Sequence, residues 1–184
     1  MREMFQQLWK VLDEFPEHVV IGGIAATLMG SPRTTADVDI VLVLPPREAE
    51  RVVTSCERHG FRPGPEAAAK LSAGRPTKFA FSRRFSVDIR LASFSLDRAA
   101  IQRAQEIPLF RHPLRVATPE DLIVYKLARW NAIDQVDVRH LLQRVGDSLD
   151  TAYLEDQIRV LMQEAGLPAL MERWRSIKPD HESE

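Results

Sequence analysis

Residues 18–44 read HVVIGGIAATLMGSPRTTADVDIVLVL, and this stretch decides how the rest of the chain is interpreted. The β-branched run at its start is typical of a strand, and Gly22-Gly23 interrupts it before an apolar segment that we expect to be a helix over residues 24–29. Residues 38–44 are almost all Val, Ile or Leu, which predicts a central strand covered on both faces. This order of elements predicts an α/β architecture.

Two aspartates, Asp37 and Asp39, open that second strand. Alternate residues of a strand project to the same face, so the two carboxylates point the same way. The same count in a strand predicted over residues 84–91 places Asp88 opposite a row of apolar side chains, so all three aspartates can share one face of a single sheet. Mg²⁺ prefers oxygen ligands, and two cations about 3.5–4 Å apart can bind both oxygens of a phosphoryl displacement. The set is therefore a candidate two-metal centre.

Considered alone, an Asp-x-Asp pair is more often two solvated acids at a strand edge. The upstream glycines favour the metal interpretation, because backbone amides between a strand and a helix attract an anion such as phosphate. Arg33 precedes Asp37 by four residues and could bind phosphate or neutralise the acids, or it could be an ordinary loop arginine. A phosphate site and a metal site so close in sequence indicate a site for a metal-bound nucleotide.

The chain changes in composition near residue 117. We expect residues 1–117 to form an α/β core and residues 118–184 to be helical, with the extended piece at 111–117 as the linker. Thr118-Pro119 is typical of a helix start, with threonine as the cap and proline at the first position. Further helices are predicted over residues 2–14, 47–59, 96–104, 119–130, 133–145, 150–165 and 168–177, and a further strand over residues 77–82.

Composition narrows the classes of function. The net charge of the 184 residues is −1, so nucleic acid could be bound only by a local patch. The basic residues Arg75, Lys78, Arg83, Arg84 and Arg90 could form such a strip for an RNA acceptor, or a solvated strand face. The single cysteine, Cys56, permits no internal disulfide and fits a reducing compartment. We find no signal-peptide pattern and no apolar run of spanning length, so we expect a cytoplasmic protein without a membrane partner.

Three segments together resemble the DNA polymerase β-type nucleotidyltransferase superfamily: GGIA at 22–25, RTTADVD at 33–39 and SVDIR at 86–90. Lys126 and then DQVD at 134–137 extend the match and narrow it to the AbiEii/AbiGii-type (MenA-like) nucleotidyltransferases of bacterial toxin–antitoxin and phage-defence systems. The resemblance implies an α+β fold, in which a nucleotidyltransferase-type mixed sheet flanked by helices is followed by a C-terminal helical bundle.

The resemblance also implies an activity, namely magnesium-dependent transfer of a nucleotide from an NTP to a hydroxyl acceptor. Asp37, Asp39 and Asp88 would bind two Mg²⁺ ions, and Asp88 would act as base towards the acceptor. Nucleotide contacts are implied for Gly22, Gly23, Arg33, Thr35, Lys126, Asp134 and Asp137, with Lys126 on the triphosphate. One residue departs from the pattern, because Ile24 stands where many members have a phosphate-binding serine.

Several alternatives remain open at this point. The acceptor could be tRNA, a protein side chain or a small molecule, and an aminoglycoside-type enzyme would have an acidic acceptor pocket. The chain could instead be a catalytically degenerate module that binds nucleotide, RNA or an antitoxin partner. Lys126, Asp134 and Asp137 could form salt bridges on a helical surface without touching a ligand.

Overall fold

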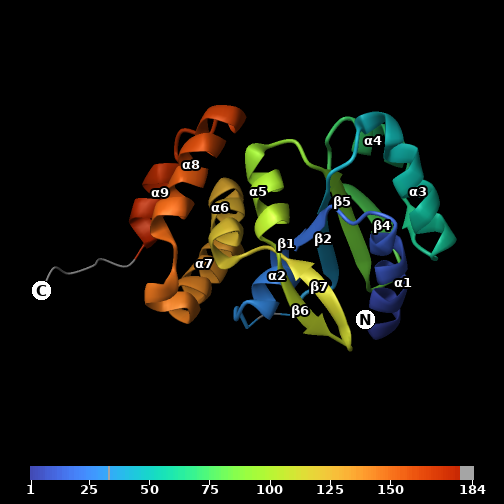
Figure 1. The fold of residues 1–184 in the computed structure, drawn as a ribbon, viewed down its shortest axis with the longest axis horizontal. Coiled ribbons are helices and arrows are strands. Elements are labelled where there is room, and N and C mark those ends of the chain that lie inside the picture. The colour runs from blue at the N-terminus through green and yellow to red at the C-terminus, as the bar shows by residue number, and fades with distance from the viewer. Residues whose placement is uncertain (33, 179–184) are drawn as a thin grey trace, which may run out of the picture.

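The fold was obtained as a computed structural model, which describes residues 1–32 and 34–178. Within these residues, the strands form one seven-stranded sheet in the order β3-β4-β5-β2-β1-β7-β6. β2 runs parallel to β5 and β1 runs parallel to β7, whereas the other neighbours are antiparallel. Helices lie on both sides of this mixed sheet (Figure 1), which confirms the predicted α+β class.

The strands are β1 (His18–Ile21), β2 (Asp37–Leu42), β3 (Arg62–Pro63), β4 (Thr77–Ala80), β5 (Ser86–Leu91), β6 (Gln105–Leu109) and β7 (His112–Val116). The α-helices are α1 (Arg2–Asp13), α2 (Gly22–Leu28), α3 (Ala49–Arg58), α4 (Ala67–Ser72), α5 (Ser95–Arg103), α6 (Pro119–Arg129), α7 (Ala132–Val145), α8 (Thr151–Ala165) and α9 (Leu170–Ile177), and short 3₁₀ turns are η1 (Pro46–Glu48) and η2 (Gly146–Ser148).

The helices form two layers around the sheet. α1, α3 and α4 lie on one side, and α2, α5 and the C-terminal helices α6–α9 lie on the other (Figure 1). The apolar residues of β2 and β5 alternate with polar ones, and Val38, Ile40, Val87 and Ile89 are almost completely buried. These side chains anchor the two strands in the core, so the alternate positions face the layer that contains the C-terminal helices.

The pairing register of β2 and β5 determines where the aspartates lie relative to one another. Along the parallel pair β2 and β5, Asp39 lies opposite Asp88, and Asp37 lies opposite Ser86. Side chains at paired positions of neighbouring strands project to the same face. The predicted common face for the three aspartates is therefore confirmed.

Two predictions about local structure were wrong. α2 begins at Gly22 and not at residue 24, so the two glycines form the first turn of the helix. The segment predicted as a linker is also part of the sheet, because β6 and β7 form a hairpin and β7 pairs with β1. Pro108 and Pro113 stand opposite each other near the hairpin's end, where few hydrogen bonds are lost.

The C-terminal helices follow the sequence prediction closely. The Thr118 side chain accepts a hydrogen bond from the Asp121 backbone N–H, which caps α6 as expected. α8 contacts α5, and Glu164 of α8 accepts hydrogen bonds from the backbone and side chain of Ser95. This contact brings α8 to the edge of the face that holds the aspartates. In the described part of the chain, no helix has the length and apolar character needed to cross a membrane.

Candidate active site

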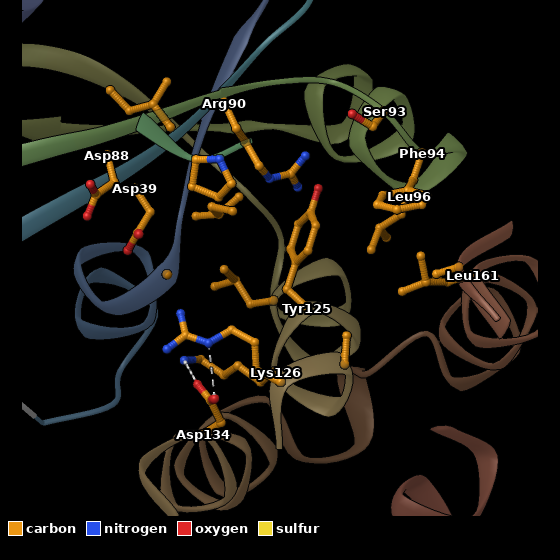
Figure 2. A pocket seen from close by; sticks show the side chains of 18 of the residues that line it. Asp39, Asp88, Arg90, Ser93, Phe94, Leu96, Tyr125, Lys126, Asp134 and Leu161 are labelled. Carbon is orange, nitrogen blue, oxygen red and sulfur yellow. Dashed lines mark hydrogen bonds and ion pairs between the residues drawn. The ribbon is translucent and has the colours of Figure 1, made fainter. Parts of the chain in front are cut away.

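A pair of carboxylates, Asp39 and Asp88, forms the centre of the site (Figure 2). Burial raises the pKa of Asp39, and the negative charge of Asp88 raises it further. The charge of Arg129 and a hydrogen bond from the Gly23 backbone oppose this shift without cancelling it. The two carboxylates therefore concentrate negative charge that a bound cation would relieve.

Gly22 is the residue that lets Asp39 occupy this position. Its φ is +71°, and a Cβ atom built there would lie 1.9 Å from Asp39 Oδ2. Any side chain at this residue would therefore collide with the carboxylate, and the backbone conformation would be strained as well. The structure shows that Gly22 provides space for Asp39, and its predicted contact with phosphate stays a prediction.

We expect Gly22→Ala to destabilise the fold and to displace the Asp39 carboxylate. The left-handed backbone alone costs roughly 1–2 kcal/mol for a residue other than glycine. Thermal unfolding with and without Mg²⁺ would measure both effects, because displacement of Asp39 should remove any stabilisation by the metal. Gly166→Ala is the matched control, since Gly166 has φ +65° but nothing within 4 Å of its Cβ position. A Mg²⁺ response retained in Gly22→Ala would contradict this role.

Asp37 is held differently from the other two aspartates. Ser86 Oγ donates a hydrogen bond to Asp37 Oδ1, and Lys78 Nζ lies 3.4 Å from the same oxygen. The hydrogen bond from Ser86 lowers the pKa of Asp37, as does the charge of Lys78, and these effects outweigh its desolvation. Lys78 Nζ is also 3.4 Å from Asp88 Oδ2, so the ammonium group lies between the two acids.

The three aspartates do not form a closed metal cluster here. Across residues 1–32 and 34–178, no three His, Cys, Asp or Glu side chains converge closely enough to hold a metal ion. Asp37 is instead engaged by Ser86 and Lys78. Asp39 and Asp88 nevertheless offer the oxygen donors that Mg²⁺ prefers, so the residues present fit a divalent cation.

A polar pocket of about 210 Å³ opens above the carboxylates. Most of the predicted nucleotide-binding residues line it, and three further residues that were not predicted join them. The lining comprises Gly22, Gly23, Thr35, Asp37, Asp39, Asp88, Lys126 and Asp134 together with Arg129, Asn131 and Ile133. The prediction for Arg33 lies outside the described residues. Asn131 caps α7 through the Asp134 backbone N–H, and this cap pattern was the sequence signal that could have identified it.

Lys126 is a buried cation of the site, and it is paired with two carboxylates. Its Nζ lies 2.6 Å from Asp137 Oδ2 and 3.5 Å from Asp134 Oδ1, and all three residues are at most 3% exposed. Ser31 Oγ donates a hydrogen bond of 2.7 Å to Asp137 Oδ1. The interhelical salt bridge considered from the sequence is therefore present, but it is buried. Asp137 is not among the residues that line the polar pocket, but it contacts Lys126, which is.

A second cavity, of about 390 Å³, adjoins the first. It lies between the sheet and helices α5, α6 and α8 and shares Gly22, Asp39, Asp88, Lys126, Arg129 and Asp134 with the polar pocket. In Figure 2, Asp39 and Asp88 lie at one side of it, with Tyr125, Leu96 and Leu161 across from them. The sequence did not predict this cavity, because α8 closes it from a distant part of the chain.

Comparisons with known proteins define the class of fold. No family model and no curated protein matches the chain. Among solved structures, that of the antibiotic-resistance factor ANT(2'')-Ia aligns over 93% of this chain and 96% of its own, with a TM-score of 0.55 and 15% identity. The chain therefore has a nucleotidyltransferase-like fold, as its motifs implied.

Two further solved structures are more distant. One is the lincosamide antibiotic adenylyltransferase LnuA with lincomycin bound, at a TM-score of 0.47, 13% identity and coverage of 74% of this chain and 94% of its own. The other is an antigenic nucleotidyltransferase-like protein from Paracoccidioides brasiliensis, at a TM-score of 0.47 and 16% identity. Its alignment covers 88% of this chain and 86% of its own. At these identities the likeness concerns the fold alone, and the AbiEii/AbiGii-type assignment stays a prediction.

Proposed function

We propose that this chain is a magnesium-dependent nucleotidyltransferase that moves a nucleotide from an NTP to a hydroxyl acceptor. One observation carries the proposal: Asp39 and Asp88 lie in register at the boundary shared by a polar pocket and a second cavity. Such a boundary allows a nucleotide and an acceptor to meet at the same carboxylates. The motif resemblance and the nucleotidyltransferase-like fold support the same activity.

Asp39 and Asp88, with Asp37 beside them, would hold Mg²⁺. Bound there, the ion would offset the negative charge of the phosphates and of the reacting oxygens. The raised pKa of Asp39 supports this role, because burial and the charge of Asp88 leave its carboxylate poorly compensated. Lys78 contacts both Asp37 and Asp88, and we infer that it would release at least one of them when the cation binds.

The remaining residues would bind and orient the substrates. Gly22, Gly23 and Thr35 line the polar pocket and would face the phosphates, while Lys126 and Asp134 would lie at its far wall. The acceptor oxygen would attack the α-phosphorus, and Asp88 would accept its proton. The bond from the α-phosphorus to the bridging oxygen breaks, and pyrophosphate leaves with the electron pair.

The direct test follows the α-phosphate label of each NTP into a pool of acceptors that contains total RNA, protein and small molecules. We expect labelled product with Mg²⁺ and none with EDTA. Asp88→Asn should reduce labelling by about 10²–10⁴-fold, the range for loss of a general base. The control is titration calorimetry of NTP with Mg²⁺, which shows whether each variant still binds substrate. Labelling that persists in Asp88→Asn or in EDTA would rule out the proposed chemistry.

A second candidate is a non-catalytic nucleotide-binding module. The position of Lys78 favours it, because an ammonium group already lies 3.4 Å from both Asp37 and Asp88. Desolvation would lower the pKa of Lys78, but the charges of Asp88 and Asp37 raise it overall, so the lysine is firmly protonated. Under this candidate, calorimetry would detect NTP binding while no acceptor becomes labelled.

The toxin–antitoxin setting, a tRNA or protein acceptor, an antitoxin partner and a cytoplasmic location are proposals that rest on the motif resemblance and composition. The reaction above does not depend on any of them. Labelling of a tRNA band would support the toxin-like setting, and labelling of a protein band would favour a protein acceptor.

A further inference from the structure

The cavity of about 390 Å³ beside the polar pocket is distinguished by the chemistry of its walls. Its lining is mainly apolar and aromatic, with Ile40, Phe94, Leu96, Leu122, Leu161 and Leu167 among its residues. Its volume of about 390 Å³ falls within the range of about 300–1,000 Å³ that is usual for small-molecule sites. Residues of α8 complete the wall, so the C-terminal helices take part in forming the cavity.

Arg90 lies deep in this wall, and a network of hydrogen bonds around the buried Asp97 neutralises its charge. Arg90 makes two hydrogen bonds to Asp97, of 2.8 and 2.5 Å, and its guanidinium lies 5.7 Å from the Tyr125 ring. The Tyr125 hydroxyl donates to Asp97 Oδ1 at 2.7 Å, and Asp97 is fully buried. The Ser93 and Phe94 backbone N–H groups also donate to Asp97. The wall therefore presents aromatic and aliphatic surface to a ligand, and the charge of Arg90 is already paired with Asp97.

The other cations that line the cavity are paired as well. Lys126 contacts Asp137 and Asp134, and Arg129 Nε lies 3.4 Å from Asp134 Oδ2. A phosphate backbone would have to compete with these carboxylates for each cation. Of the three carboxylates that line the cavity, Asp134 is engaged by Lys126 and Arg129, and Asp39 and Asp88 lie at the end where the nucleotide and its metal would also bind.

We propose that this cavity binds the acceptor, and that the acceptor is a neutral, largely apolar small molecule with a hydroxyl group; the inference rests on the proposed function and specifies its acceptor. The apolar body would pack against α5, α6 and α8, and the hydroxyl would point to Asp88. Its oxygen bonds to the α-phosphorus, its proton passes to Asp88, and pyrophosphate departs with the electrons of the broken bond. The product is a nucleotidyl ester of the alcohol.

Binding can be tested without turnover by using the neutral fluorescent probe N-phenyl-1-naphthylamine and the full chain. We expect the probe to bind the wild-type protein and to bind Ala165→Trp about tenfold more weakly or worse, because the indole fills the cavity. Ala152→Trp is the matched control, since Ala152 is an exposed residue of the same helix that does not line the cavity. Calorimetry of NTP with Mg²⁺ should give the same affinity in all three proteins. Equal probe binding by Ala165→Trp and the control would overturn the inference.

The class of acceptor is tested by offering 2-naphthol, tobramycin or total tRNA with α-labelled NTP and Mg²⁺. We expect label in the 2-naphthol product, and we expect Ala165→Trp to lose it while Ala152→Trp keeps it. Label in tobramycin or tRNA without label in 2-naphthol would overturn the inference and leave the proposed function intact. No label in any acceptor, despite probe binding that Ala165→Trp weakens, would count against the proposed function and support an apolar binding site.

Discussion

Asp39→Asn is expected to lower nucleotidyl transfer by roughly 10³-fold, because loss of about 4 kcal/mol of metal-linked transition-state stabilisation corresponds to that factor. Asparagine keeps the oxygen that accepts a hydrogen bond from the Gly23 backbone, so the local fold should survive. What it loses is the charge that, together with Asp88, would hold the cation. Single-turnover transfer from labelled NTP measures the rate, and calorimetry of Mg²⁺ binding measures the loss of the metal site.

The same variant should be more stable than the wild type when no metal is present. Burial and the charge of Asp88 raise the pKa of Asp39 in the folded protein. The folded state then binds more protons than the unfolded chain, so the free energy of unfolding falls as pH rises from the ordinary pKa of about 3.9 through the raised pKa. Asparagine does not titrate and escapes this loss. We expect a higher melting temperature than wild type at pH 7 in EDTA, and no gain below the ordinary pKa.

Asp37→Asn is the control, because the pKa of Asp37 is shifted in the opposite direction to that of Asp39. A hydrogen bond from Ser86 and the charge of Lys78 lower the pKa of Asp37, so its ionised form stabilises the fold above the ordinary pKa and this contribution is lost as pH falls. Its side chain is 47% exposed, so the effect should be small. Asp37→Asn should therefore not raise the melting temperature at pH 7. If Asp39→Asn is less stable than wild type at pH 7 in EDTA, the carboxylates of Asp39 and Asp88 do not repel each other as inferred.

The sequence carried enough information to place the three aspartates on one face. Their positions follow from the period-2 alternation in β2 and β5, which is a local property of each strand. The burial of Val38 and Ile40 allows only one orientation of β2. The Thr118 cap was predictable for the same reason, because its partner lies three residues away.

What could not be predicted depends on elements that meet only in the fold. Lys78 reaches Asp88 because β4 and β5 pair in antiparallel register, and no local pattern specifies that register. The Arg90, Asp97 and Tyr125 network joins β5, α5 and α6. The sequence interpretation placed Lys78 and Arg90 in a group that could form either a basic strip for RNA or a solvated strand face. In the structure each is paired with carboxylates, so neither contributes a free positive charge towards RNA.

Lys126→Met is expected to destabilise the fold by about 3–5 kcal/mol, the usual cost of removing one partner from a buried ion pair. Lys126 Nζ lies 2.6 Å from Asp137 Oδ2, and methionine would leave that carboxylate buried with only its other contacts, such as the hydrogen bond from Ser31. In a chain of this length each kcal/mol shifts the melting temperature by roughly 2–4 °C, so the fall should be of the order of 10 °C. Arg129→Met is the matched control, because the Arg129 side chain is 66% exposed and its pairing with Asp134 should contribute about 1 kcal/mol or less.

The double variant Lys126→Met with Asp137→Asn separates the structural role of the lysine from a role in binding the nucleotide. Asparagine at 137 removes the charge that Lys126 neutralises in the wild type and can still accept the hydrogen bond from Ser31, so the double variant should recover much of the lost stability. If it then binds NTP with Mg²⁺ about tenfold more weakly than wild type, Lys126 contacts the triphosphate directly. If its affinity equals that of wild type, Lys126 acts by joining α6 to α7 beneath the pocket. A melting temperature of the single variant no lower than that of Arg129→Met would contradict the buried pairing itself.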